Sequence, residues 1–111
     1  LLIGGIGSVD AANWYTVGTD SNGVTWSIDN DSVKKDDKKA VMDIKAMDYE
    51  GYHYIVTEEF NHKKREVKDL KVTLYNPQGY VVKEEQVNKN SRKVEPGTPA
   101  YAVFQLIWGG K

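Results

Sequence analysis

Much of the chain alternates apolar and polar residues with a period of two, the pattern of β-strands that bury one face. The clearest run is 24–28, in which Val24, Trp26 and Ile28 alternate with a threonine and a serine. Runs of this kind, rich in aromatic and β-branched residues, predict six strands. They lie at 14–18, 24–28, 40–47, 52–60, 70–74 and 80–86.

Short turn motifs separate several of these strands. Asn22-Gly23 predicts a two-residue hairpin turn of type I′, in which both residues have positive φ. Residues 48–51 predict another turn. Asn76-Pro77-Gln78-Gly79 predicts a type I turn followed by a glycine in the left-handed bulge position. Strands that follow each other through short turns pair antiparallel, so the chain is expected to form a meander-like sheet.

The period changes near the C-terminus. Thr98 can cap a helix, and Pro99 suits the first helical position, where its missing N–H costs nothing. Tyr101, Phe104 and Trp108 then lie on one helical face, and Gly109-Gly110 ends the element. A strand is the competing prediction, because several residues in the run are β-prone, but the Thr-Pro entry favours a helix. The predicted fold class is α+β: about six antiparallel strands packed against one C-terminal helix.

The first residues are the most apolar of the chain. Residues 1–7 contain only Leu, Ile and Gly, and Val9 and Ala11 fit the small-residue positions of a signal-peptidase site. We therefore interpret residues 1–12 as the remnant of a secretory signal peptide and residues 13–111 as one domain that is exported to the periplasm, cell surface or medium. An extra N-terminal strand or a cloning remnant is the alternative. Seven apolar residues are too few to span a bilayer, so no transmembrane segment is predicted.

Composition narrows the function classes. The chain has 111 residues and a formal net charge of −1, whereas duplex nucleic-acid binders carry a clear basic excess, so no nucleic-acid partner is predicted. It has no cysteine, which removes disulfides, thiolate metal sites and cysteine nucleophiles.

We find no residue set that supports catalysis. His53 and His62 would fall on opposite faces of one unbroken strand, so we interpret them as surface histidines rather than as ligands of a shared metal ion. Glu58 and Glu59 also point to opposite faces, and they are interpreted as edge and solvent charges rather than an acid–base pair. The sequence predicts no enzyme, no cofactor and no bound metal.

One segment, 61–71, is basic, with five basic and two acidic residues. It could bind an acidic partner, such as a protein or an acidic polysaccharide, or be a solvated loop, which is common for such runs. The mixed-charge run 34–39 is interpreted as a solvated loop. Tyr49, Tyr52, Tyr54 and Tyr80 could form an exposed aromatic platform, although half-buried sheet packing is favoured. The candidate ligand-binding residues are Lys63, Lys64, Arg65, Lys68, Tyr52 and Tyr54.

Several short motifs together resemble a known family. They are Trp14 near the mature N-terminus, a hairpin into Ser27-Ile28-Asp29, Lys64-Arg65 before 70–75, the Gly79 turn, and Glu95-Pro96-Gly97-Thr98 before an apolar end. This pattern, over roughly 13–108, resembles the surface-adhesin protein E family of small exported bacterial domains. The resemblance implies an antiparallel sheet with a packed helix, and adhesion to host matrix proteins such as vitronectin and laminin. The namesake is a lipoprotein, whereas this chain has no cysteine to carry a lipid, so its mode of anchoring is not carried over.

The expected function is therefore a non-enzymatic exported binding module whose implied role is adhesion to a host extracellular-matrix protein. The alternative is a structural or assembly domain of the cell envelope that self-associates without a host ligand. Either role allows a homodimer, because an edge strand can pair with a second copy.

Overall fold

The computed structural model describes residues 12–87 and 90–109. The predicted signal remnant therefore lies outside the described residues, apart from Ala12. In chain order the elements are β2 (Trp14–Thr19), β3 (Thr25–Asp29), the short 3-10 helix η2 (Asn30–Ser32), β4 (Lys34–Lys35), β5 (Lys39–Met47), β6 (His53–Asn61), β7 (Glu66–Tyr75), β8 (Val81–Gln86), β9 (Arg92–Lys93) and α1 (Pro99–Trp108).

The described strands form one antiparallel sheet in the order β2-β3-β5-β6-β7-β8, with β4 paired to β5 and β9 paired to β7. The six predicted strands and the meander order are confirmed. The two-residue strands β4 and β9 were not predicted, because two residues carry no period. β7 begins at Glu66 rather than near residue 70, so the basic run lies partly on a strand.

Three hairpin turns share one geometry. Each begins with Asp or Asn, whose carbonyl accepts from the glycine three residues on and whose side chain accepts two further backbone N–H groups. These turns begin at Asp20, Asp48 and Asn76, and their glycines have positive φ. The bulged turn predicted at Asn76 is confirmed. The type I′ prediction at Asn22-Gly23 is wrong, because φ is positive at Gly23 but not at Asn22. Asp20 supplies the hydrogen bonds instead, and the Trp26 indole bond and the Val24 N–H bond lower the pKa of its carboxyl.

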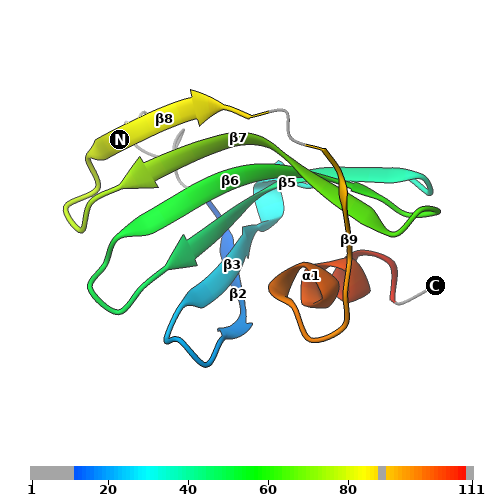
Figure 1. The fold of residues 1–111 in the computed structure, drawn as a ribbon, viewed down its shortest axis with the longest axis horizontal. Coiled ribbons are helices and arrows are strands. Elements are labelled where there is room, and N and C mark those ends of the chain that lie inside the picture. The colour runs from blue at the N-terminus through cyan, green and yellow to red at the C-terminus, as the bar shows by residue number, and fades with distance from the viewer. Residues whose placement is uncertain (1–11, 88–89, 110–111) are drawn as a thin grey trace, which may run out of the picture.

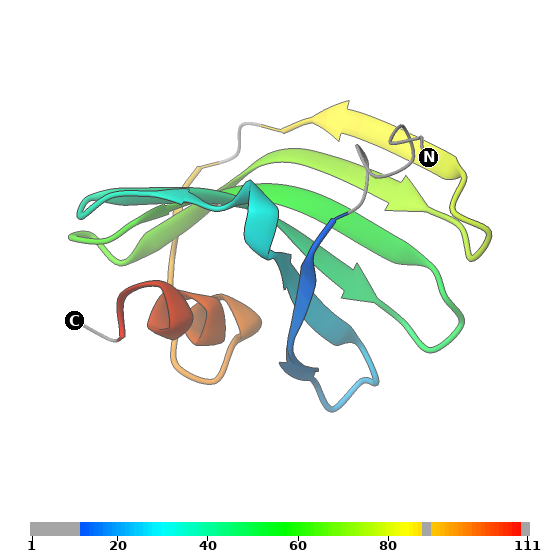
Figure 2. The ribbon, with the colours of Figure 1, turned by 180° about the vertical axis from the view of Figure 1, so that it is seen from behind.

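The core lies between one face of the sheet and α1, and we call this the inner face. Figures 1 and 2 show the sheet arching over the helix. Burying this apolar surface is the main force that holds the two layers together. The core residues are Ile28, Ala40, Met42, Ile44, Phe60 and Val67 from the sheet, and Val103, Phe104 and Ile107 from α1.

The helix begins and ends as predicted. The Thr98 hydroxyl accepts from the N–H of Tyr101, Pro99 opens the first turn, and Gly109 closes the helix with φ of 65°. The opposite, outer face of the sheet carries mostly polar side chains, and register alternation places Asp43, Thr57, Lys71 and Thr73 on it.

Candidate ligand-binding surface

The structure separates the six predicted ligand-binding residues into two groups. Lys63, Lys64 and Arg65 lie in the turn between β6 and β7, and Lys68 pairs in register with Glu59 nearby. Tyr52 and Tyr54 lie at the far end of β6. Seven residues of strand, 55–61, separate Tyr54 from the turn that carries Lys63, which corresponds to about 23 Å. The two groups therefore do not form one site.

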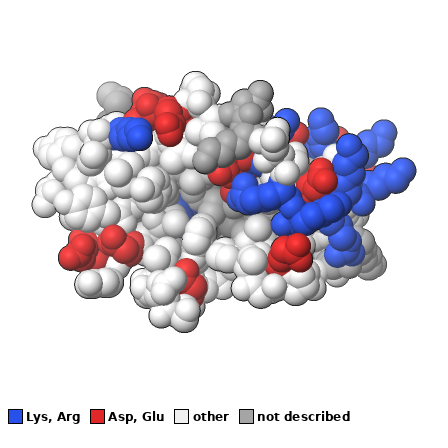
Figure 3. Space-filling model, viewed as in Figure 1, with Lys and Arg blue, Asp and Glu red and all other residues white. Residues whose placement is uncertain are grey.

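The turn between β4 and β5 joins the basic group. The backbone N–H of His62 donates to the carbonyl of Lys38 at 2.9 Å, and His62 Nδ1 lies 2.8 Å from the carbonyl of Asp37. We call residues 34–39 and 61–68 together the basic end. They carry eight Lys and Arg residues against three Asp and Glu residues. Figure 3 shows these cations gathered at one end of the molecule.

The sequence-based interpretation of 34–39 as an ordinary solvated loop missed this convergence. The two turns are distant in the chain, and only the pairing of β5 with β6 brings them side by side. The two aspartates of 34–39 also made the run look electrically mixed. One of them, Asp36, binds backbone N–H groups of the turn itself. Its carboxylate accepts from the N–H groups of Lys39 and Lys38, which lowers its pKa.

The cations of the basic end differ in their contacts. Lys35 Nζ donates to the carbonyl of Ile107 at 2.8 Å and so satisfies the end of α1, and Lys39 lies 3.9 Å from Glu59. Within the described part of the chain, no ion pair or hydrogen bond engages the ammonium groups of the remaining four exposed lysines. They are Lys34, Lys38, Lys63 and Lys64.

An aromatic cluster supports the basic end from beneath. The His62 ring stacks on Trp108 with centroids 4.3 Å apart and planes 2° from parallel, and Phe104 meets both rings edge to face. The Arg65 guanidinium lies 5.3 Å from the Phe104 ring centroid. Trp108 Nε1 also donates to the carbonyl of Asp36 at 3.2 Å, so α1 holds both turns in place.

Arg65 has φ of 54°, and among the described residues no other residue apart from glycine has positive φ. The left-handed conformation costs a side-chain-bearing residue about 1–2 kcal/mol. The corresponding position in the other three hairpin turns is a glycine. Strain of this kind often accompanies functional positions.

At the far end of β6, four tyrosines are well exposed. The exposed fractions of Tyr49, Tyr52, Tyr54 and Tyr80 are 86%, 44%, 48% and 71%. The favoured expectation of half-buried packing is wrong for Tyr49 and Tyr80, whereas the exposed fractions of Tyr52 and Tyr54 agree with it. Tyr49 and Tyr80 lie in or beside loops, and α1 packs on core residues from the other half of the strands, where Phe60 and Val67 lie.

A group of three charged side chains, of which only Glu58 is buried, lies on the inner face. Glu58 is 8% exposed, and its Oε2 accepts from Arg92 Nη2 at 2.9 Å. A second guanidinium nitrogen, Nη1, donates to Asp69 at 3.2 Å. Burial, together with the hydrogen bond and like charge of Asp69, raises the pKa of Glu58 to about 8, against the opposing effect of Arg92. The interpretation of Glu58 as a solvent charge is therefore wrong, although Glu58 and Glu59 do point to opposite faces.

This group borders a pocket of about 430 Å³ between the sheet, the segment before α1 and the first turn of α1. Trp26, Val56, Pro99 and Val103 line its apolar part. Glu58 could have been noticed in the sequence, because it occupies an inward position between Val56 and Phe60. Nothing in the sequence pairs it with Arg92.

In the described residues, no group of three His, Cys, Asp or Glu side chains could hold a metal ion. His53 lies on the outer face, where its ring stacks on Tyr75 at 5.1 Å, and His62 packs on Trp108. No described helix is long and apolar enough to cross a membrane.

The fold is a small α+β domain, a sheet with one packed helix, that has a cationic end and an exposed aromatic end. A family model for surface-adhesin protein E matches residues 14–107, so the chain belongs to that family, and the resemblance found in the sequence is confirmed. Membership supports an adhesin-like, non-enzymatic binding role and an exported or cell-surface location. Neither the curated proteins nor the solved structures include a match.

Proposed function

We propose that this protein is an exported bacterial domain that adheres to a host extracellular-matrix protein through its basic end. The observation that carries the proposal is the convergence of two distant turns, which presents eight basic side chains on a rigid aromatic support. Family membership supplies the adhesin class. The matrix partner follows from the resemblance to the namesake.

The basic end suits an acidic protein surface. Four lysines without partners in the described residues can form new ion pairs without first breaking old ones. Exposed charges of this kind mainly steer encounter, and salt screens them over about 8 Å at physiological ionic strength. Binding should therefore be fast at low salt and weaken strongly as salt is added.

The test is surface plasmon resonance on immobilised vitronectin and laminin, with heparin as an acidic polysaccharide. Wild-type protein is compared with Lys63→Ala, Lys64→Ala and the double variant, at low and physiological salt. Lys83→Ala is the matched control, because it removes an exposed lysine from β8, away from both turns. We expect salt-sensitive binding that falls with Lys63→Ala and Lys64→Ala but not with Lys83→Ala. Salt-independent binding, or equal loss in the control, would contradict the proposal, and binding to heparin alone would move the partner to a polysaccharide.

A second candidate, self-association without a host ligand, is favoured by β8. This edge strand is exposed at all six positions, so its outer backbone groups can pair with another strand. Because Val87 N–H donates to Leu70, alternation turns the backbone groups of Glu84 and Gln86 away from β7. A two-fold axis beside Glu84 would then place Lys83 opposite Glu85 of a second copy.

Charge exchange tests this candidate. Lys83→Glu alone and Glu85→Lys alone each place like charges opposite each other, whereas the double variant restores opposite charges. Light scattering after size exclusion should then show a dimer for the wild type and the double variant, and a monomer for each single variant. A mixture of the two single variants should form a heterodimer. A wild-type monomer at high protein concentration would rule out this candidate and leave the adhesion proposal untouched.

A further inference from the structure

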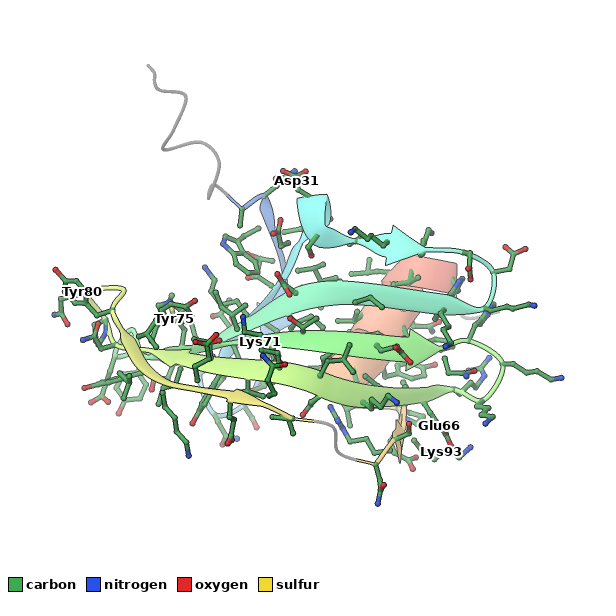
Figure 4. All side chains as sticks on the ribbon, turned by 90° about the horizontal axis from the view of Figure 1, so that it is seen from above. Asp31, Glu66, Lys71, Tyr75, Tyr80 and Lys93 are labelled. Atoms are coloured by element: carbon green, nitrogen blue, oxygen red, sulfur yellow. The ribbon has the colours of Figure 1, made fainter. Side chains whose placement is uncertain are left out.

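The outer face of the sheet holds a pocket of about 320 Å³, on the opposite side from α1. It is built by β2, β3, β5, β6 and β7, and its lining includes Trp14, Asp43, Thr57, Lys71, Thr73 and Tyr75. Figure 4 looks onto this face and shows Lys71 and Tyr75 along β7. The volume lies at the lower end of the range for small-molecule sites, roughly 300–1,000 Å³, so it suits one ring rather than a long chain.

The floor of the pocket offers both hydrogen-bond donors and acceptors. Asp43 Oδ1 accepts from the Thr57 hydroxyl at 2.7 Å, which fixes the carboxylate and leaves its second oxygen available. Thr73 is only 5% exposed, and its hydroxyl makes no hydrogen bond with any described residue. The Thr73 hydroxyl is not among the buried polar atoms that lack a partner in the described residues, so it is accessible from the pocket and can hydrogen-bond a polar ligand there.

The charges around the pocket nearly balance. Asp29 and Asp43 contribute two negative charges, and Lys71 and the nearby Lys45 contribute two positive ones. Lys71 is held 3.0 Å from Glu84 on the neighbouring strand, which adds a third negative charge. The pocket therefore does not favour an anion, in contrast to the basic end. The suitable ligand is neutral and rich in groups that both donate and accept.

Aromatic rings stand at both ends of this floor. Trp14 comes from β2 and Tyr75 from β7, with three strands between them in the sheet order. Both rings are held by neighbours: Lys45 Nζ lies 4.5 Å from the Trp14 ring centroid, and Tyr75 stacks on His53. Rings held in place lose little conformational entropy on binding, which makes them good platforms for the apolar face of a ligand.

We infer that the outer-face pocket binds one neutral pyranose ring of a glycan, through its hydroxyl groups on the polar floor and its C–H face on the aromatic rings. This site lies on a different surface from the basic end, so sugar binding and adhesion through the basic end can be tested independently. Weak affinity is expected for a single sugar, in the millimolar range that is usual for small ligands with few contacts.

The test is titration of the isotope-labelled full chain with methyl glycosides of glucose, galactose, mannose and N-acetylglucosamine, followed by amide and indole NMR shifts. Glucuronate is the charged comparison. We expect at least one neutral glycoside to give saturable shifts at the Trp14 indole and at the amides of 43, 57 and 73. Mapping on the wild type locates the site even where a variant fails to fold.

Two matched variants sharpen the result. Thr73→Val keeps the side-chain shape, removes the pocket hydroxyl and should weaken binding about tenfold. Ser27→Ala removes an equally buried hydroxyl on the same face, but outside the pocket lining, and should leave binding unchanged. The Lys63→Ala/Lys64→Ala protein should bind the sugar like the wild type. No saturable shift with any neutral glycoside, shifts centred elsewhere, or binding of glucuronate alone would overturn the inference.

Discussion

Glu58 should make the protein less stable as the pH rises. Its carboxyl has a pKa of about 8 in the folded protein and 4.5 as an ordinary glutamate. Below pH 4.5 both the folded and unfolded states hold the proton. Between pH 4.5 and 8 only the folded state keeps it, so the folded state binds more protons and stability falls with rising pH. Above pH 8 this contribution is lost.

The size of the effect follows from the shift. Each pH unit between the two pKa values lowers the free energy of unfolding by about 1.4 kcal/mol, which amounts to about 4 kcal/mol between pH 5 and 8.5. This is a large part of the 5–15 kcal/mol that roughly stabilises a small domain. Glu58→Gln removes the titration and keeps the shape of the protonated acid, with an oxygen for Arg92 and an N–H for Asp69. The free energy of unfolding of the variant should therefore equal that of the wild type or be lower at pH 5, and should be higher by a few kcal/mol at pH 8.5.

Urea unfolding at pH 5, 7 and 8.5, followed by tryptophan fluorescence, measures the difference between the two proteins. Subtracting the variant from the wild type cancels the titration of all other groups that the substitution leaves unchanged. Glu59→Gln is the control, because Glu59 is the next residue along the chain and its carboxylate points to the outer face, beside Lys39. The free energy of unfolding of this control should stay within about 1 kcal/mol of the wild-type value at each pH. Parallel stability curves for the wild type and Glu58→Gln would refute the reasoning.

Three further substitutions, two of them with a control substitution, test the turns and the helix. Arg65→Gly relieves the left-handed strain but loses the contact with Phe104, so the free energy of unfolding should stay within about 1 kcal/mol while affinity for the matrix partner falls; unchanged affinity would separate Arg65 from the binding surface. Gly79→Ala should cost about 1–2 kcal/mol in urea unfolding, because φ is 90° while the added methyl meets open space. Gly18→Ala, also open but without positive φ, should cost less, and equal costs would show that φ is not the cause. Thr98→Ala should lower stability by about 1 kcal/mol, and Thr98→Ser should retain most of it; equal losses would argue against the cap.

The fold was predictable because its signals are local. The alternation of apolar and polar residues predicts the six strands, and Thr98 with Pro99 predicts the start of the helix. The hairpin at Asp20 shows the limit of a dipeptide rule. Asn22-Gly23 fits a type I′ turn, but the carboxylate two residues earlier offers its own acceptors and selects the bulged turn.

The candidate sites were less predictable because they depend on pairing between distant segments. Lys63 and Lys64 were found from their own run, whereas Lys34 and Lys38 join them only through the register of β5 and β6. Arg92 reaches Glu58 from a strand of two residues, which no periodicity can reveal.

The most direct test of the adhesion account is the salt dependence of vitronectin binding by the wild type and the Lys63→Ala/Lys64→Ala protein. We predict that the wild type loses affinity steeply between low and physiological salt. The variant should start weaker and show a shallower slope, because fewer ion pairs form. Coincident curves for the two proteins would show that the basic end does not carry adhesion.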